Sequence, residues 1–158
     1  MLDMDHATNK NFTFVTGRRK YLLFTDITGY GEITPILSSL DEQNLLYMVY
    51  YFNEFSSNHD LKTYLSQQKM GTYIYASGNW NSIISFVKTA EKAGFTEEEL
   101  QIKGIGERIL RVFCSRCYAI NVCKTSKEMV CQSCGQSLSV SNHYSRRYDA
   151  YLGYTILN

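Results

Sequence analysis

The first hundred residues contain two kinds of segment, which differ in how apolar and polar positions are arranged. Short apolar runs bounded by polar residues or Gly predict buried strands. Segments with apolar residues at helical spacing predict helices, and Thr34 followed by Pro35 is typical of a helix start. The predicted strands are Tyr21–Thr25, Leu45–Phe52, Thr72–Ala76 and Leu100–Ile102, and the predicted helices are Pro35–Leu40, His59–Gln68 and Asn81–Ala93.

Strands and helices in strict alternation predict an α/β fold class with a small parallel sheet. Right-handed crossovers place ligands at the C-terminal ends of such strands, here near Thr28–Thr34 and Ala76–Asn79. Thr28–Glu32 and Ser77–Asn79 are predicted turns. The pattern changes from Glu107 on, where a short alternating run begins. We therefore predict a flexible N-terminal arm (1–19), an α/β domain (20–108) and a metal-binding ribbon with a basic aromatic tail (109–158).

The composition is that of an ordinary globular protein. Of the 158 residues, 44% are hydrophobic and 20% are charged, and no apolar run is long enough to span a bilayer. The N-terminus lacks the basic and apolar stretches of a secretory signal. Five cysteines without an export signal predict a cytoplasmic protein whose Cys-x-x-Cys pairs bind metal.

Four cysteines form two pairs with the spacing of a metal site. Cys114 and Cys117 make one Cys-x2-Cys pair, and Cys131 and Cys134 make the other after 13 residues. Each pair puts two thiolates on one tight turn, and the segment between them is long enough for a hairpin that joins the pairs. We predict one structural Zn²⁺ held by all four thiolates. Such a site has no open position, so we predict no catalysis by the metal.

Two alternatives to zinc stay open. Four thiolates also hold iron in a rubredoxin-like electron carrier, although Cys117 lacks the following glycine that Cys134 has in Gly135, which disfavours iron. Two disulfides are the other alternative, and a reducing compartment argues against them. The fifth cysteine, Cys123, is predicted to be a small buried or half-buried apolar residue.

The net charge of +1 conceals an asymmetry along the chain. Residues 1–102 hold 8 Lys or Arg against 12 Asp or Glu, a net charge of −4, and residues 103–158 hold 8 against 3, a net charge of +5. A basic surface can bind nucleic acid or dock an acidic protein. The basic end has no dense cluster of Lys and Arg, which disfavours nucleic acid.

The first predicted strand and helix resemble those of the nicotinamide-binding domain of ferredoxin-reductase-like flavoproteins. Thr28-Gly29-Tyr30-Gly31-Glu32-Ile33-Thr34-Pro35 is similar to that family's Gly-x-Gly-Ile-Thr-Pro loop, in which backbone amides cradle a pyrophosphate. The resemblance implies a phosphate loop at Thr28, Gly29, Gly31 and Thr34. Thr72–Asn79 is similar to the family's later strand, which ends in Cys-Gly-Pro.

The chain departs from that family at three points. Glu32 is an extra residue in the glycine loop and brings a negative charge toward the phosphates, and Ala76 replaces the reductase cysteine. The separate flavin-binding barrel is missing, so no hydride acceptor is expected on this chain. The α/β domain is therefore predicted to be degenerate. A plain strand-to-helix turn is the alternative to a phosphate-binding remnant at Thr28–Thr34.

The tail resembles the end of the small DmmA-like subunit of bacterial dimethylamine monooxygenase. The resemblance runs from Cys131 to Gly153 and includes a His-aromatic-Ser-Arg-Arg run before an Ala-aromatic-Leu-Gly ending. It implies a heteromeric, NADPH-dependent monooxygenase that converts dimethylamine to methylamine and formaldehyde. Haem, flavin and iron–sulfur centres are then expected on other subunits. This chain would be an accessory subunit without an active site, acting in assembly or in docking a redox partner.

Three polar residues of the tail are candidates for binding a partner. If a helix holds them, His143 and Arg147 share a face and Arg146 lies beside them. They could bind a partner's carboxylates or a cofactor's phosphates, because Arg makes bidentate contacts. A solvated basic face is the alternative. For the whole chain, the alternative functions are a nucleic-acid-binding zinc ribbon and a rubredoxin-like electron carrier.

Overall fold

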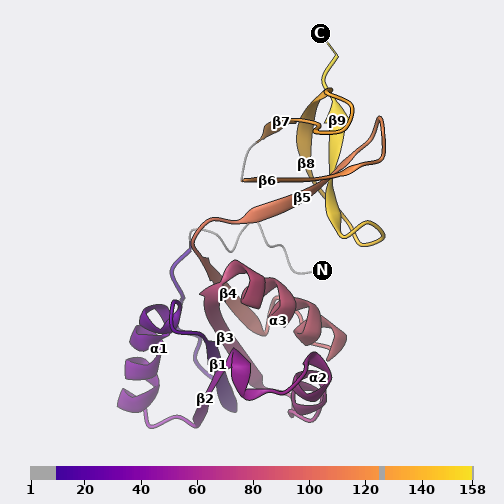
Figure 1. Ribbon diagram of the computed structural model, residues 1–158. Helices are drawn as coiled ribbons and strands as arrows, with labels where there is room; N and C mark the ends of the chain where they lie inside the picture. Colours follow the sequence, from indigo (N-terminus) through magenta and orange to yellow (C-terminus); the bar gives the residue numbers. More distant parts are fainter. Residues whose placement is uncertain (1–9, 125–126, 158) are drawn as a thin grey trace. The chain divides into compact units, whose positions relative to one another are not determined.

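The chain folds into two units in the computed structural model, which describes residues 10–124 and 127–157. One unit ends at Gly106 and the other begins at Glu107 (Figure 1), so each is described by itself. The elements of the first unit are β1 (Lys20–Thr25), α1 (Tyr30–Glu42), β2 (Tyr47–Tyr51), the 3-10 turn η1 (Phe52–Glu54), α2 (Asn58–Ser66), β3 (Thr72–Asn79), α3 (Trp80–Lys92) and β4 (Leu100–Ile105). Those of the second unit are β5 (Ile109–Cys114), β6 (Ile120–Lys124), β7 (Glu128–Val130), β8 (Ser137–Ser145) and β9 (Ala150–Thr155).

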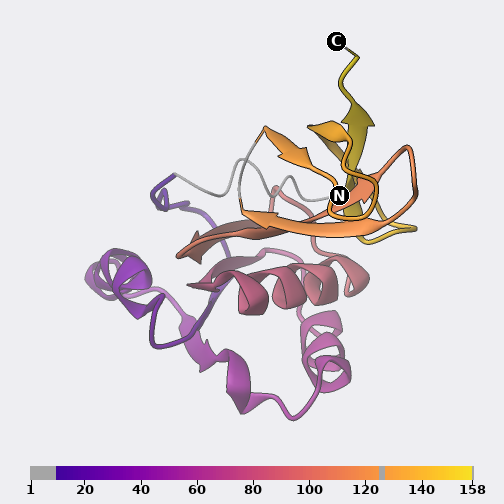
Figure 2. The same ribbon diagram turned by 45° about the horizontal axis from the view of Figure 1, so that its top comes forward.

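Four parallel strands form the sheet of the first unit, in the order β2-β1-β3-β4. Helix α1 covers one face, and α2 and α3 cover the other (Figure 1 and Figure 2). Successive residues of a strand point to opposite faces. Leu22 and Ile74 therefore pack with α2 and α3, whereas Tyr21 and Tyr75 pack with α1. This buried parallel sheet confirms the predicted α/β fold class.

Residues 10–19 were predicted to belong to a flexible arm, but they pack on the sheet. The ring of Phe12 meets Tyr75 edge-on, with 5.4 Å between ring centroids. The Tyr75 hydroxyl accepts a hydrogen bond from Val15 N at 2.9 Å and donates one to Thr13 O at 3.1 Å. The aromatic rings of β3 require cover on this face, and the arm supplies it. Residues 1–9 of the predicted arm lie outside the described residues.

Several boundaries differ from those predicted, and two of the differences, at α1 and β3, lie at the candidate loop. Helix α1 begins at Tyr30 with Gly29 as its N-cap, so Thr34 does not cap it. The Thr34 hydroxyl instead donates to the Tyr30 carbonyl at 3.0 Å, and Pro35 lies inside the helix, where its missing N–H removes one helical bond. Strand β3 continues through the predicted turn Ser77–Asn79, because β4 pairs with it along that whole segment.

A five-stranded sheet in the order β6-β5-β9-β8-β7 forms the second unit. Strands β5 and β9 are parallel, and the other neighbouring pairs are antiparallel. The buried residues form two small clusters, Leu110, Val112 and Tyr151 in one and Cys114, Cys131 and Leu138 in the other. Two thiols therefore lie among the buried residues of these clusters.

Candidate metal centre

The four predicted thiols come together in the second unit. Cys114 ends β5 and Cys117 lies in the turn after it, while Cys131 and Cys134 lie between β7 and β8. All four sulfur atoms lie within 4.8 Å of one another. Cys114 Sγ is 3.8 Å from Cys134 Sγ, and Cys117 Sγ is 3.6 Å from Cys131 Sγ. Thiolates about 2.3 Å from a tetrahedral ion stand about 3.8 Å apart, so the four cysteines could hold one metal ion.

These distances also exclude the disulfide alternative. A disulfide bond is about 2.0 Å long, and all five cysteines are free thiols. Cys114 and Cys131 are buried, whereas Cys117 and Cys134 are half-buried. Four converging thiolates fill a tetrahedral shell, so an ion held here would have no vacant position for a substrate.

The two Cys-x-x-Cys turns have the same backbone geometry. Tyr118 N donates to Cys114 O at 2.8 Å, and Gly135 N donates to Cys131 O at 2.9 Å. Both donors have a left-handed backbone, with φ of 65° at Tyr118 and 70° at Gly135. The absence of a glycine after Cys117 therefore does not distinguish a zinc site from an iron site, because Tyr118 adopts the glycine-like conformation. This argument against iron was wrong.

Asn121 on β6 is a neighbour of the thiols that sequence reasoning missed. Its side chain is 2% exposed, and its Oδ1 accepts a hydrogen bond from Gln132 N at 2.9 Å. Its Nδ2 lies 3.5 Å from Cys131 Sγ. Asn121 thus joins the first Cys-x-x-Cys hairpin to the second turn. The Cys131 sulfur also accepts a hydrogen bond from a backbone amide. This bond from the Cys134 amide, with a smaller contribution from Asn121, lowers the pKa of the Cys131 thiol to about 6.

Cys123 lies apart from the four thiols. It is half-buried and packs with the cluster that contains Leu110 and Tyr151. Burial raises the pKa of its thiol, which favours the protonated, unreactive form.

The candidate partner-binding residues of the tail do not lie on a helix. His143 belongs to β8, and Arg146 and Arg147 lie in the turn between β8 and β9. They therefore do not share the helical face proposed for them, because His143 lies in the irregular part of β8 between Val140 and Tyr144, and the two arginines follow Ser145, the last paired residue. All three side chains are exposed. Arg147 lies over the ring of Tyr148, 5.4 Å from its centroid. Their role in partner binding stays a prediction.

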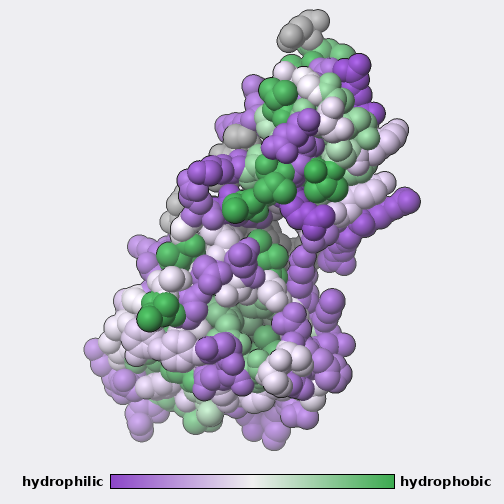
Figure 3. Space-filling view, viewed as in Figure 1, coloured by the Kyte–Doolittle hydropathy of each residue, from purple (hydrophilic) through white to green (hydrophobic). Residues whose placement is uncertain are grey.

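One face of the second sheet carries exposed apolar side chains. Cross-strand neighbours share a face, and the register pairs Phe113 with Ile120 and Arg111 with Val122. The ring of Tyr148 stacks on Phe113 with 4.1 Å between centroids. Figure 3 shows apolar residues among polar ones on the visible part of this unit. We define the outer face by its exposed apolar residues, Ile109 (59%), Tyr118 (71%), Ile120 (40%), Val122 (56%), Tyr148 (36%) and Tyr154 (48%).

The predicted phosphate-loop residues lie at the C-terminal end of β1, in the first unit. Thr28 and Gly29 form the turn before α1, whereas Gly31 and Thr34 lie inside the helix. The Asp26 carboxylate accepts hydrogen bonds from the backbone amides of Thr28 and Gly29, each at 2.9 Å. These two amides therefore already have an anionic partner within the chain. Phosphate binding by this loop stays a prediction.

Among the described residues, no helix combines the length and the apolar character needed to cross a membrane.

Comparison of sequences relates the chain to subunits of an N-demethylating enzyme. Residues 111–154 match the family described as dimethylamine monooxygenase subunit DmmA-like, C-terminal domain. The chain is also 25% identical over 138 residues to the "Heme-dependent oxidative N-demethylase delta subunit" of Ectopseudomonas mendocina (strain ymp). That alignment covers 85% of this chain and 78% of the relative. The resemblance predicted for the tail is confirmed.

Two solved structures resemble the chain more distantly. One is phthalate dioxygenase reductase, described as a modular structure for electron transfer from pyridine nucleotides to [2Fe-2S], with a TM-score of 0.46 and 15% identity over 73% of this chain. The chain spans about half of its length, 47%. The other is full-length CYP116B46 from Tepidiphilus thermophilus, with a TM-score of 0.38 and 17% identity over 70% of this chain and 19% of that one.

Proposed function

We propose that this chain is an accessory, non-catalytic subunit of a cytoplasmic, haem-dependent oxidative N-demethylase complex. The observation that carries the proposal is the similarity to a delta subunit of such an enzyme along 85% of the chain. The match of residues 111–154 to a domain of a dimethylamine monooxygenase subunit supports dimethylamine as the substrate. We further propose that the complex demethylates it to methylamine and formaldehyde with NADPH. Haem, flavin and iron–sulfur centres belong to the other subunits in this proposal.

The thiol cluster supports a structural role for the second unit. We propose that it holds one Zn²⁺, because four thiolates at these separations suit a tetrahedral ion. Cys114, Cys117, Cys131 and Cys134 would bind it, and the ion would supply stability rather than a reaction site.

Iron in the same position would make the chain an electron carrier, and the equivalent geometry of the two turns is compatible with that alternative. Elemental analysis and a visible spectrum of the purified chain separate the two. We expect about one zinc per chain and no colour, whereas iron held by four thiolates is coloured.

The outer face supports a role in docking or assembly. Exposed apolar patches mark surfaces that bind other proteins. Two basic residues lie close by, and each already has a carboxylate partner within this chain: Arg111 on β5 is 3.3 Å from Asp149, and Lys124 on β6 is 3.0 Å from Glu107. We propose that the outer face docks on an apolar surface of another subunit of the complex.

The test is co-purification from cells that produce the chain together with the haem-, flavin- and iron–sulfur-bearing subunits. A tagged wild-type chain should carry them along, which the haem and flavin spectra of the purified material would reveal. A chain that stays alone beside these subunits would contradict the subunit assignment.

A substitution on the outer face separates the docking surface from the assignment itself. Val122→Glu places a charge in the apolar patch and should abolish co-purification, because burying an unpaired carboxylate is unfavourable. Thr63→Glu, on the exposed side of α2, is the matched control and should leave the complex intact. If Val122→Glu still co-purifies with the other subunits, the outer face is not the docking surface, but the proposed role as a subunit is not contradicted.

A further inference from the structure

The C-terminal edge of the first sheet is where a nucleotide would bind in a domain of this topology. Strand order β2-β1-β3-β4 means that the chain leaves β1 toward one edge of the sheet and leaves β3 toward the other. The crevice between the C-terminal ends of β1 and β3 is therefore the topological switch point, the usual position of a ligand in such sheets. Thr28 and Gly29 lie at this point, directly after β1.

A carboxylate of the chain already occupies the hydrogen-bond donors of this crevice. Asp26 Oδ1 accepts from Thr28 N at 2.9 Å, from the Thr28 hydroxyl at 2.5 Å and from Gly29 N at 2.9 Å. Asp26 Oδ2 accepts from Asn79 N at 2.8 Å and from Asn79 Nδ2 at 2.9 Å. The carboxylate thus bridges the end of β1 to the end of β3 through five hydrogen bonds, the arrangement that a bound phosphate oxygen pair would otherwise make.

The space beside the loop is also filled. A Cβ added to Gly29 would lie 2.3 Å from the carbonyl carbon of Ser77, so the loop backbone lies directly against β3. A Cβ added to Gly78 would lie 2.6 Å from Asp26 Oδ2 and 2.9 Å from the ring of Phe52. In a dinucleotide site such glycines allow the backbone to approach the pyrophosphate. Here the close approach is made by the chain itself.

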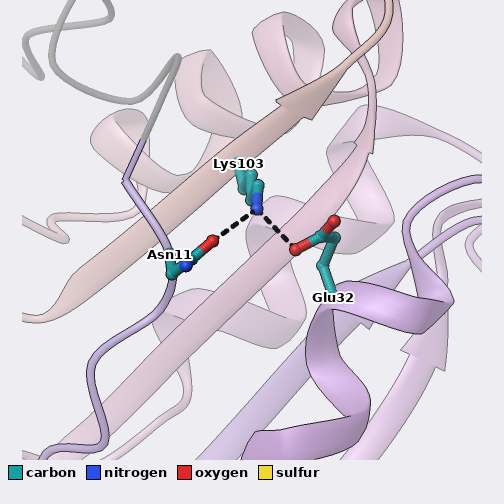
Figure 4. Close-up of polar contacts among 3 residues, drawn as sticks. All are labelled: Asn11, Glu32 and Lys103. Atoms are coloured by element: carbon teal, nitrogen blue, oxygen red, sulfur yellow. Dashed lines mark hydrogen bonds and ion pairs between the residues drawn. The ribbon is translucent and has the colours of Figure 1, made fainter.

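A cation on β4, Lys103, pairs with a carboxylate of the same loop region. Lys103 on β4 lies 2.5 Å from a carboxylate oxygen of Glu32 in the first turn of α1, and the Lys103 ammonium also donates to Asn11 Oδ1 at 3.1 Å (Figure 4). The Lys103 side chain is only 14% exposed. Glu32, the extra residue of the glycine loop, therefore pairs with the positive charge that a bound phosphate would need.

We propose that Asp26 is a built-in anion that fills the phosphate position of this loop, so that the first unit binds no pyridine dinucleotide. The carboxylate joins β1 to β3 as a permanent internal ligand, and the unit is a closed scaffold. The proposal concerns residues 10–106 alone, so it does not depend on the subunit assignment.

The first test is titration of the wild-type full chain with NADPH and, separately, with inorganic pyrophosphate. Calorimetry should show no binding with a Kd below about 1 mM. The fluorescence of Trp80, the one tryptophan of the chain, reports melting of the first unit, and neither probe should raise its melting temperature. Binding or stabilisation of the wild-type chain by either probe would overturn the proposal.

The second test removes the internal anion and supplies a small one from solution. Asp26→Ala should lower the melting temperature of the first unit by roughly 5–10 °C. Sodium formate should restore part of that loss relative to sodium chloride at the same ionic strength, because formate can occupy the vacated carboxylate position. Asp41→Ala removes a carboxylate from the same unit that accepts a hydrogen bond from the Tyr47 hydroxyl and lies away from Asp26 in the sequence, so this control should show no formate effect.

A third variant covers the case in which Asp26→Ala does not fold. Asp26→Asn fills the same space but turns one acceptor into a donor, so it should melt below the wild type and should not respond to formate. Wild-type stability in Asp26→Asn, or a foldable Asp26→Ala with neither a lower melting temperature nor a formate response, would refute the role assigned to the carboxylate.

Discussion

Replacing Asn121 with Ala should weaken metal binding by the second unit. The buried Asn121 side chain accepts a hydrogen bond from Gln132 N at 2.9 Å, and its Nδ2 lies 3.5 Å from Cys131 Sγ. The ordinary hydrogen bond and the long contacts of Nδ2 with Cys131 Sγ and with the carbonyls of Val112 and Ala119 are together worth about 2 kcal/mol. Because about 1.4 kcal/mol corresponds to a factor of ten, the loss amounts to roughly 30-fold in metal affinity. Groups that orient metal ligands commonly have effects of about this size.

Competition between the purified chain and a coloured chelator for Zn²⁺ measures this change directly. Asn121→Asp is an informative second variant, since it keeps an acceptor for Gln132 but lacks the donor and adds negative charge beside the thiolates. It should bind zinc at least as weakly as Asn121→Ala. The exposed Asn142 on β8 provides the matched control, and Asn142→Ala should bind like the wild type. Zinc affinity of Asn121→Ala within about threefold of the wild type would refute the reasoning.

Three further outcomes are expected. Tyr75→Phe removes two of the hydrogen bonds that hold the arm, so hydrogen exchange of the Val15 amide, which donates to the Tyr75 hydroxyl, should accelerate while the rest of the first unit stays protected; unchanged exchange would contradict this anchor. Tyr118→Gly relieves a left-handed backbone strain of about 1–2 kcal/mol, loses a ring contact with Phe113 worth about 0.5–1.5 kcal/mol and adds about 0.5–1 kcal/mol of unfolded-chain entropy, so the free energy of unfolding in urea should change by less than about 1.5 kcal/mol, and a larger loss would refute the reasoning. Burial raises the pKa of the Asp26 carboxyl, but hydrogen bonds from Thr28, Asn79 and Gly29 outweigh it and lower the pKa. This stabilisation is present above the unfolded pKa of about 3.9 and is lost as pH falls through the lower folded value, so Asp26→Ala should show a weaker acid dependence of first-unit stability than the wild type.

Local patterns were sufficient for the parts of the fold that depend on short stretches of chain. The run Tyr21–Thr25 predicted β1 almost to the residue, because a strand buried on both faces has to be apolar throughout. The two Cys-x-x-Cys pairs predicted a common cluster, because two such pairs in one chain supply the four thiolates of a tetrahedral metal site. Thr34 and Pro35 led to a wrong prediction of the helix start. Both residues are typical of a first helical turn, but the helix begins at Tyr30 and contains them.

Errors and omissions occurred where a residue's role depends on a distant partner. The run His143–Arg147 has no strong periodicity of its own, and within it only Tyr144 and Ser145 pair with β9, at Tyr151 and Ala150, before the chain turns. The left-handed Tyr118 is invisible in the sequence, because only the closing of the turn onto Cys114 imposes that backbone on a residue other than glycine.

The amino-acid sequence by itself determined the parallel α/β unit, the four thiols and the resemblance of the tail, since spacing and apolar pattern act over a few residues. Only the tertiary structure decided what the glycine loop contacts. Asp26 and Asn79 are 53 positions apart, and the carboxylate fills the loop because parallel pairing of β1 and β3 brings their ends together. Asn121 likewise reaches Cys131 and Gln132 only after the hairpins have closed. A hydrogen bond depends on position in space, and for such pairs the fold alone sets that position.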